Sequence, residues 1–273
     1  MVPRPFRTML AALTASLALS SVPAAAQFSN CQAIASAFPD ARMITVASES
    51  PSEEYAVEIR YIGHSTFRIT APDGTTIATD YAGAAGAGPV PDVVTMNHAH
   101  TSHFTNFPDP AIPHVLQGWG TNGAPADHMV EVGEVLVRNV TTDIRSYAGV
   151  EPDGNSIFIF EIQGLCLGHL GHLHQPLSDG QIAEIGRLDV VFVPVDGSYT
   201  MNQETMMEVV SRLRASIAVP MHWFGSYTLA DFLTRTRSDG MEVVMQSEPV
   251  LRVSLNTLPR RPTMIVLPLS FAN

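Results

Sequence analysis

The sequence predicts a layered α/β fold built around one hydrophobic core. Short, strongly apolar segments typical of buried strands recur along the chain, and segments with helical spacing separate some of the later ones. The 273 residues are 45% hydrophobic and only 15% charged. This composition supplies a substantial core and argues against extensive disorder. We see no linker that would divide residues 56–273, and we expect them to form one domain.

Residues 1–26 are typical of a secretory signal peptide. Arginines in MVPRPFR precede the apolar stretch MLAALTASLALSSV, and AAA before Gln27 offers a cleavage site of small residues. No other apolar run approaches the ~20 residues that a membrane-spanning helix requires. We therefore expect a periplasmic or secreted protein that is not inserted in the membrane after cleavage. An uncleaved anchor is the alternative. Residues 27–55 are expected to form a loose N-terminal lead-in.

The charge of the chain excludes several partners and mechanisms. The formal net charge is −11, and it becomes −13 without residues 1–26 (13 arginines against 26 acids). Such an acidic protein is poorly suited to nucleic acid or anionic membranes, so we expect a small-molecule substrate. All basic residues are arginines, which excludes a lysine nucleophile. No G-x-S-x-G motif indicates a serine nucleophile. The sequence does not determine the oligomeric state.

The first half of the domain reads as a series of strands. AVEIRYI and TFRIT are separated by GHS, the turn signal APDG precedes TTIATD, and the loop GAAGAGPVP leads to the apolar segment DVVTM. We predict strands over residues 56–62, 66–70, 75–80 and 92–96. Since DVVTM is a continuous apolar run, its strand is expected to be buried.

The second half alternates strands with helices. We predict strands over residues 134–140, 156–162, 188–195 and 216–221, and three more strand-like runs close the chain. A helix is expected over 177–186, where Ser178 and Gln181 form a capping-box pattern. Another is expected over 202–214, where Met206, Val209, Val210 and Leu213 recur at helical spacing.

The two cysteines, Cys31 and Cys166, allow two interpretations. Export to an oxidising compartment would permit a disulfide between them. Cys166 lies in the apolar run GLCLGHL, however, and such a position also suits a buried free thiol. The apolar setting argues against an activated Cys166 nucleophile.

Histidines gather at the ends of predicted strands. Of ten histidines, three follow DVVTM, two follow the strand around LCL, and one follows IAV; they are His98, His100, His103, His169, His172 and His222. Ligand sites collect at the carboxyl ends of strands in α/β sheets. A lone histidine is more often structural, but this convergence predicts a metal site. Neutral imidazole suits zinc, with manganese or iron as alternatives, and one or two ions could be held.

The segment NHAHTSH resembles the H-x-H-x-D-H signature of the metallo-β-lactamase superfamily. Supporting pieces occur in the family's order over about residues 55–225, and they are YIGHSTFRI, TIATD, GLCLGHLGHLHQPL, DVVFVPVDGSYTM and VPMHW. The resemblance is to the lactonase-like branch. It implies a four-layer αββα sandwich with one or two metals at one edge of two sheets. It also implies a metal-dependent hydrolase.

Carried over residue by residue, the resemblance implies a ligand set. His98 and His100 match ligands of a first metal, and His103 and His222 match ligands of a second. His172 stands where the family has a bridging aspartate, and His169 precedes it. Asp143 is the best substitute for the missing third ligand of the first metal. Asp80 matches a residue that orients the ligands. His64 could support the ligands, face the substrate or be a turn histidine, and Trp223 could either wall an apolar substrate pocket or pack in the core.

Two departures from the family pattern shape the functional hypothesis. Ser102 and His172 replace aspartates, so the centre is nearly all imidazole, and we expect one tightly bound metal with a weaker or absent second. We expect a metal-bound hydroxide to attack an ester, lactone, amide or phosphoester. Asp143, Asp196 or a non-ligand histidine such as His174 would act as base, or none is needed. The alternative is a non-catalytic metal- or ligand-binding protein on the same fold.

Overall fold

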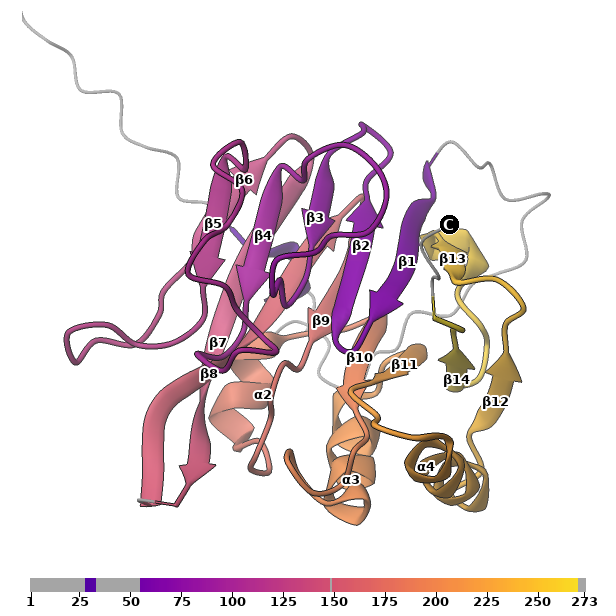
Figure 1. Cartoon of the computed structure of the whole chain (residues 1–273). Coiled ribbons are helices and arrows are strands. Elements are labelled where there is room, and N and C mark those ends of the chain that lie inside the picture. Colours follow the sequence, from indigo (N-terminus) through magenta and orange to yellow (C-terminus); the bar gives the residue numbers. More distant parts are fainter. Residues whose placement is uncertain (1–27, 33–54, 148, 270–273) are drawn as a thin grey trace, which may run out of the picture.

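The computed structural model describes residues 28–32, 55–147 and 149–269. The predicted signal peptide and most of the N-terminal lead-in lie outside these residues. Within them, no helix combines the length and apolar character needed to cross a membrane. The elements form two stacked sheets with three α-helices packed below them in the view of Figure 1.

The first sheet has six strands in the order β13-β1-β2-β3-β4-β5. Its strands are β1 (Val57–Gly63), β2 (Thr66–Thr70), β3 (Thr76–Ala78), β4 (Val93–Met96), β5 (His114–Gln117) and β13 (Val250–Val253). The β1, β2, β3 and β13 pairings are antiparallel, whereas β4 pairs in parallel with both β3 and β5. The predicted strands of the first half are therefore present.

The second sheet has eight strands in the order β12-β14-β11-β10-β9-β8-β7-β6. They are β6 (Met129–Val132), β7 (Val135–Ser146), β8 (Gly149–Ile162), β9 (Leu165–His169), β10 (Val190–Pro194), β11 (Ile217–Met221), β12 (Glu242–Met245) and β14 (Thr263–Val266). From β9 to β12 the pairings are parallel, and from β6 to β9 they are antiparallel. Carboxyl ends of β9, β10 and β11 therefore meet at one edge.

Helices cover the outer face of the eight-stranded sheet. They are α2 (Asp179–Ile185), α3 (Gln203–Leu213) and α4 (Ser226–Ser238), with a short 3-10 helix η2 (Leu255–Thr257) further on. The predicted capping box starts α2, where Ser178 and Gln181 bond each other's backbone N–H groups. The predicted second helix is α3, and its Met206, Val209, Val210 and Leu213 are buried.

Strand β10 shows why continuous apolar runs mark the central strands. Val190 and Phe192 face the core between the two sheets, while Val191 and Val193 face the core under the helices. A strand covered on both faces needs apolar residues at every position, because its side chains alternate between the two cores. The same reason explains the buried pattern of β4 and β11.

The fold class is confirmed, with one difference in its layers. The outer face of the six-stranded sheet is covered by coil segments 81–92 and 97–113 in the described part of the chain. There Tyr81 and Ile112 pack on Val94 and Met96, with Phe104 and Trp119 at the margin. Glycine and proline in these segments disfavour a helix.

Strands β5 and β6 and helix α4 were not predicted from the sequence. Strands β5 and β6 have only four residues each, so neither gives a strong strand signal in the sequence. Helix α4 contains four polar β-branched or small hydroxyl residues after Ser226, which weakens its helical pattern. Its buried Phe232, Leu233 and Thr236 nevertheless lie on one face against α3 and β12.

A disulfide joins Cys31 to Cys166 in β9, with 6.0 Å between their Cα atoms. Of the two alternatives for Cys166, a disulfide and a buried free thiol, the structure has the disulfide. Cys166 therefore has no thiol for catalysis. The same short N-terminal segment is also held by Ser29, whose hydroxyl donates to Glu161 at 2.5 Å, and Glu161 accepts from Arg138 at 2.9 Å. Ser29 and Cys31 are thus tied to the sheet.

We predict that loss of this disulfide lowers the free energy of unfolding by about 2–5 kcal/mol, because it closes a long loop in the unfolded chain. Urea unfolding of the oxidised protein, with and without reductant, measures the difference. A Cys31→Ser/Cys166→Ser double variant is the control and should be insensitive to reductant. Equal unfolding midpoints for the oxidised and reduced protein would contradict the prediction.

Candidate metal centre

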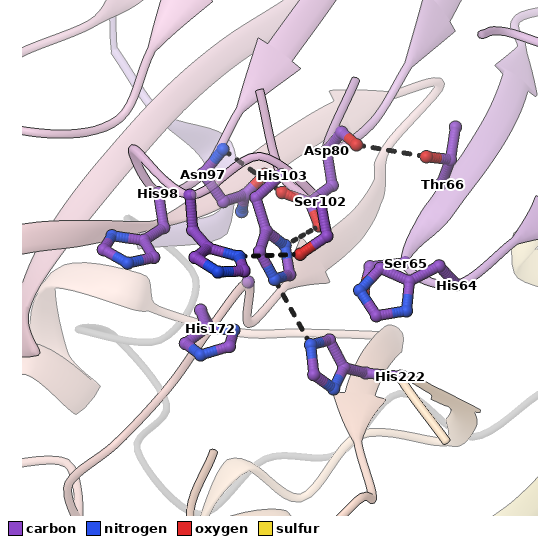
Figure 2. Close-up of polar contacts among 12 residues, drawn as sticks. His64, Ser65, Thr66, Asp80, Asn97, His98, Ser102, His103, His172 and His222 are labelled. Atoms are coloured by element: carbon purple, nitrogen blue, oxygen red, sulfur yellow. Dashed lines mark hydrogen bonds and ion pairs between the residues drawn. The ribbon is translucent and has the colours of Figure 1, made fainter. Parts of the chain in front are cut away.

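Four segments that are distant in the sequence bring histidines to one edge of the sheets. His64 lies in the turn between β1 and β2, and His98, His100 and His103 follow β4. His172 follows β9, and His222 follows β11. Figure 2 shows His64, His103, His172 and His222 directed toward a common centre. Strand ends that meet at this edge therefore assemble the cluster.

The backbone is strained at three positions of this cluster. His64, Asp80 and His222 have positive φ angles of 50°, 50° and 58°. Residues with a Cβ rarely adopt this conformation, and it is retained where the surrounding structure enforces it, often at functional sites. The His222 N–H donates to the His64 carbonyl at 2.8 Å, so two strained residues hold each other in place.

The centre of the cluster is the pair His103 and His222. The Nδ1 of His103 contacts Asp80 Oδ2 at 2.5 Å, and the Nδ1 of His222 contacts Asp196 Oδ1 at 3.0 Å. A carboxylate accepts a hydrogen bond from the N–H at each Nδ1, so a neutral ring has its lone pair on Nε2. The two Nε2 atoms lie 3.2 Å apart. Two facing lone pairs repel, so this arrangement is stabilised by either a shared proton or a metal ion between them.

A metal ion fits this pair better than a shared proton. Two nitrogens bound to one tetrahedral zinc at about 2.0–2.1 Å lie about 3.3–3.4 Å apart, close to the observed separation. A third imidazole is also present, because ligand atoms of His64, His103 and His222 all lie within 4.8 Å of one another. His64 Nε2 is buried without a partner in the described structure. Three converging imidazole nitrogens match the three protein ligands of a catalytic zinc site, whereas a shared proton needs only two nitrogens.

The electrostatics keep His64 available as a ligand. Burial, together with the neighbouring His222 and His103, lowers the pKa of His64 to about 4. The ring is therefore neutral at pH 7 and retains a lone pair. The sequence did not single out His64 as a ligand, but its position beside His103 and His222 is compatible with that role.

Asp80 is the buried anchor of His103, as predicted. Its side chain has no exposed surface, and besides His103 it accepts from the Asn97 N–H at 3.3 Å. Burial raises the pKa of Asp80, but the charge and hydrogen bond of His103 more than offset this effect, so the pKa lies below its ordinary value. The carboxylate stays ionised and fixes the ring of His103.

Asp196 has the same role for His222. It also accepts from the N–H groups of Ser198, Tyr199 and Thr200 and from the Thr200 hydroxyl at 2.5 Å. Burial raises the pKa of Asp196, but these hydrogen bonds and His222 hold it well below its usual range. The sequence left Asp196 as one of several candidates for a base. Here both of its oxygens are engaged in orienting His222 and its loop.

A second group of histidines lies beside the first. The ring of His172 lies 4.5 Å from that of His103 and 5.3 Å from that of His98, and His98 and His100 are stacked at 6.3 Å. His98 Nδ1 donates to the Gly154 carbonyl at 2.7 Å, which leaves its Nε2 free. His100 Nδ1 contacts the Ser102 hydroxyl at 2.9 Å. These partners are neutral, unlike the carboxylates behind His103 and His222.

His172 lies between the two groups. Its Nδ1 is buried without a partner in the described structure, and burial strongly lowers its pKa, aided by the neighbouring histidines. Its backbone N–H donates to Asn155 Oδ1 at 2.7 Å, which fixes its position at the end of β9. A neutral ring with an unused nitrogen next to both groups is compatible with the predicted ligand role.

His169 is not free to bind a metal. Its Nε2 donates to the Ser65 carbonyl at 2.8 Å, and its Nδ1 accepts from Gly171 N–H at 3.1 Å and from Asn97 at 3.2 Å. The predicted ligand role is therefore wrong. Instead, His169 ties the β1–β2 turn, β4 and the segment before His172 together.

Two further predictions are corrected by the structure. Asp143 lies in β7, where its carboxylate accepts from the Asp153 N–H at 3.1 Å, and it is not part of the cavity wall beside the histidines. This position does not support its predicted role as a ligand or a base. Trp223 packs against the core and the ring of Tyr61 at 5.3 Å. Its neighbour Phe224 lines the cavity in its place.

A cavity of about 790 Å³ opens onto the cluster. His98, His100, His172, His174 and His222 lie in its wall, together with Ser102. His174 Nδ1 accepts from the Arg145 N–H at 2.9 Å, so the neutral ring has its proton on Nε2. Burial and the nearby Arg145 lower the pKa of His174 to about 4. His174 is therefore a neutral hydrogen-bond donor in the cavity wall.

Sequence reasoning missed several residues of this cavity. Arg145 and Glu151 lie in the segment VTTDIRSYAGVEPDGNSIF, whose long hairpin was not predicted, and both line the wall. Tyr199 and Phe224 also line the cavity, and both were missed even though each lies within three residues of a predicted site residue. Proximity to Asp196 and His222 was the signal that could have identified them.

Two stacked mixed sheets with helices, and a histidine cluster at the strand ends, define a metal-dependent hydrolase of the metallo-β-lactamase fold. The family model described as beta-lactamase superfamily domain matches residues 58–222, more than half of the sequence. The chain therefore belongs to this superfamily, as the motif NHAHTSH indicated.

Curated relatives and solved structures agree. A UPF0173 metal-dependent hydrolase of Anaeromyxobacter dehalogenans is 28% identical over 208 residues, which cover 62% of this chain and 75% of the relative. A UPF0173 metal-dependent hydrolase of Methanoculleus marisnigri is 28% identical over 184 residues, which cover 61% of this chain and 81% of the relative. A Thermotoga maritima structure, described as a candidate Zn-dependent hydrolase of the metallo-β-lactamase superfamily, is 28% identical with a TM-score of 0.57 and covers 78% of this chain and 100% of that one.

We predict that Asp80→Asn lowers metal affinity about 10- to 100-fold, because the amide no longer fixes the His103 ring and removes a negative charge. Competition with a chromophoric chelator measures the affinity. Asp189→Asn is a matched control, since Asp189 is buried to a similar degree but lies before β10, at the opposite end of that strand. Equal metal affinity in wild type and Asp80→Asn would remove Asp80 from the centre.

We also predict one tightly bound metal per wild-type chain and a second in Ser102→Asp. The new carboxylate would stand beside His100 in the group that has only neutral partners, and its charge would attract a second cation. Elemental analysis after dialysis gives the stoichiometry, and Ser102→Asn is the uncharged control. Two tight equivalents in the wild type, or one in Ser102→Asp, would contradict the prediction.

Proposed function

We propose that this chain is an exported, zinc-dependent hydrolase that acts on a small-molecule ester, lactone, amide or phosphoester. The observation that carries the proposal is the pair of carboxylate-backed imidazoles, whose Nε2 atoms face each other at 3.2 Å next to a large cavity. Nitrogen-rich donor sets of this kind suit zinc, with manganese and iron as the alternatives.

The proposed division of labour follows from the hydrogen bonds. His103, His222 and His64 would hold the metal, which supplies polarisation of a substrate oxygen and a lowered pKa for water. Asp80 and Asp196 orient two of these rings and offset part of the charge. His174, with its proton on Nε2 and no partner there, would donate a hydrogen bond to a substrate oxygen.

The structure also bears on the choice of a base. The carboxylates of Asp80 and Asp196 are committed to histidines, and Asp143 is held away from the cavity. This supports the alternative in which water activation requires no separate carboxylate base.

Two observations support export. Residues 1–26 have the pattern of a cleaved signal peptide, and Cys31 and Cys166 are joined in a disulfide. Disulfides persist in oxidising compartments such as the periplasm and are rare in the cytosol. We therefore propose a periplasmic or secreted location.

The proposal predicts that His103→Ala and His222→Ala lose tight zinc binding and hydrolysis, because each removes a nitrogen that is oriented by a carboxylate. Protein exported by a bacterial host, which should begin at Gln27, would be loaded with zinc, manganese or iron. It would then be assayed on esters, lactones, β-lactams and phosphodiesters. His114→Ala, on β5 and outside the cluster, should retain activity. Zinc uptake without turnover of any substrate would favour a binding protein instead.

A further inference from the structure

The cavity beside the metal centre has one positively charged side chain in its wall among the described residues, that of Arg145. Arg145 is at the end of β7, where the β7–β8 hairpin extends beyond the rest of its sheet, at the lower left of Figure 1. The chain as a whole is strongly acidic, with a formal net charge of −11. The cavity wall therefore has a positive charge although the chain is acidic overall, and a molecule that enters the cavity would meet this charge.

Two hydrogen bonds fix Arg145 relative to the metal centre. Its backbone N–H donates to His174 Nδ1 at 2.9 Å, and its Nη2 donates to the Thr200 carbonyl at 3.2 Å. Thr200 belongs to the loop that binds Asp196, which orients His222. The guanidinium is thus attached to the same loop as a metal ligand, and its distance from the centre is set by the fold.

The guanidinium keeps most of its binding capacity. It has five N–H donors, and the bond to Thr200 uses one of them. No carboxylate of the described residues forms an ion pair with Arg145. Glu151 also lines the cavity, but its side chain lies next to Gly154. The Gly154 carbonyl accepts a hydrogen bond from His98, so Glu151 is on the His98 side of the cavity. Arg145 is free to bind an anion.

Apolar side chains lie near this cation. Tyr199 and Phe224 are in edge contact at 5.2 Å between ring centroids, and Phe224 lies 5.2 Å from the ring of His222. They remain 66% and 62% exposed, and Ile144 adds an aliphatic side chain to the same wall. Exposed aromatic rings beside a reaction centre provide contact area for the apolar part of a ligand.

Building on the proposed hydrolase function, we propose that the substrate is a carboxylate-bearing acyl compound with an apolar body. Arg145 binds the carboxylate, Tyr199 and Phe224 contact the body, and the scissile ester or amide carbonyl lies at the histidine cluster. Arg145 is therefore a specificity residue of this cleft. Planar guanidinium groups suit carboxylates because two parallel N–H donors match two oxygens.

The test compares acyl chains that differ only in the terminal group. Mono-4-nitrophenyl esters of succinic, adipic and suberic acid are assayed against 4-nitrophenyl butyrate, hexanoate and octanoate with zinc-loaded protein. At the best chain length, kcat/KM should favour the acidic ester about 10- to 100-fold, the size of a charge-assisted bidentate contact. Arg145→Gln should remove this preference, and Arg145→Lys should restore part of it.

A binding measurement separates this inference from the proposed hydrolase function. Calorimetric titration of the zinc-loaded protein with adipate and hexanoate should show tighter binding of adipate, and Arg145→Gln should abolish the difference. Arg235→Gln is the matched control, because Arg235 lies exposed on α4 and its loss changes the net charge equally. This variant should retain the wild-type preference.

The outcomes are distinct. Preference for the dicarboxylate without turnover of any ester would support Arg145 as an anion site and overturn the hydrolase proposal for these substrates. Turnover of both ester series with equal kcat/KM would support the hydrolase and overturn the inference. A preference that survives Arg145→Gln would also overturn it. Glu151→Gln should keep the preference, since Glu151 is on the His98 side.

Discussion

The contact between His103 and His222 constrains the rest of the centre. Their Nε2 atoms lie 3.2 Å apart, and each ring is held from behind by a carboxylate. Two imidazole lone pairs at this distance repel, so a shared proton or a bound metal ion stabilises this arrangement. The family's usual carboxylate ligands are absent from positions 102 and 172, yet negative charge is still supplied. It comes from Asp80 and Asp196, which act through the histidines.

The hydrogen bonds of each histidine determine its role more sharply than its position in the sequence. His169 has both ring nitrogens engaged and serves as a structural tie. His64 and His172 have a buried nitrogen without a partner in the described structure, as a ligand would before binding. Leaving a buried polar atom unpaired costs about 1–3 kcal/mol, so such atoms at the convergence of strand ends indicate function.

The loop after β10 connects the proposed metal centre to the cavity wall. Asp196 orients His222 and accepts several backbone N–H groups of the loop, while Thr200 in that loop holds the Arg145 guanidinium. Tyr199 contributes to the cavity wall. A single short segment therefore fixes a metal ligand, an apolar contact and a cation, and a change in its conformation would alter all three together.

The sequence by itself determined the buried strands, two of the helices, the family and the histidines at strand ends, because apolar runs and ordered motifs are local signals. It also identified Asp80. Only the tertiary structure decided that Cys31 pairs with Cys166, that His169 is satisfied, and that Asp143 is held away from the centre. These depend on atoms brought together from distant segments, for which a single sequence has no signal. The same reason explains why Arg145 was recognised only once β7 and β8 were seen to extend to the cavity wall.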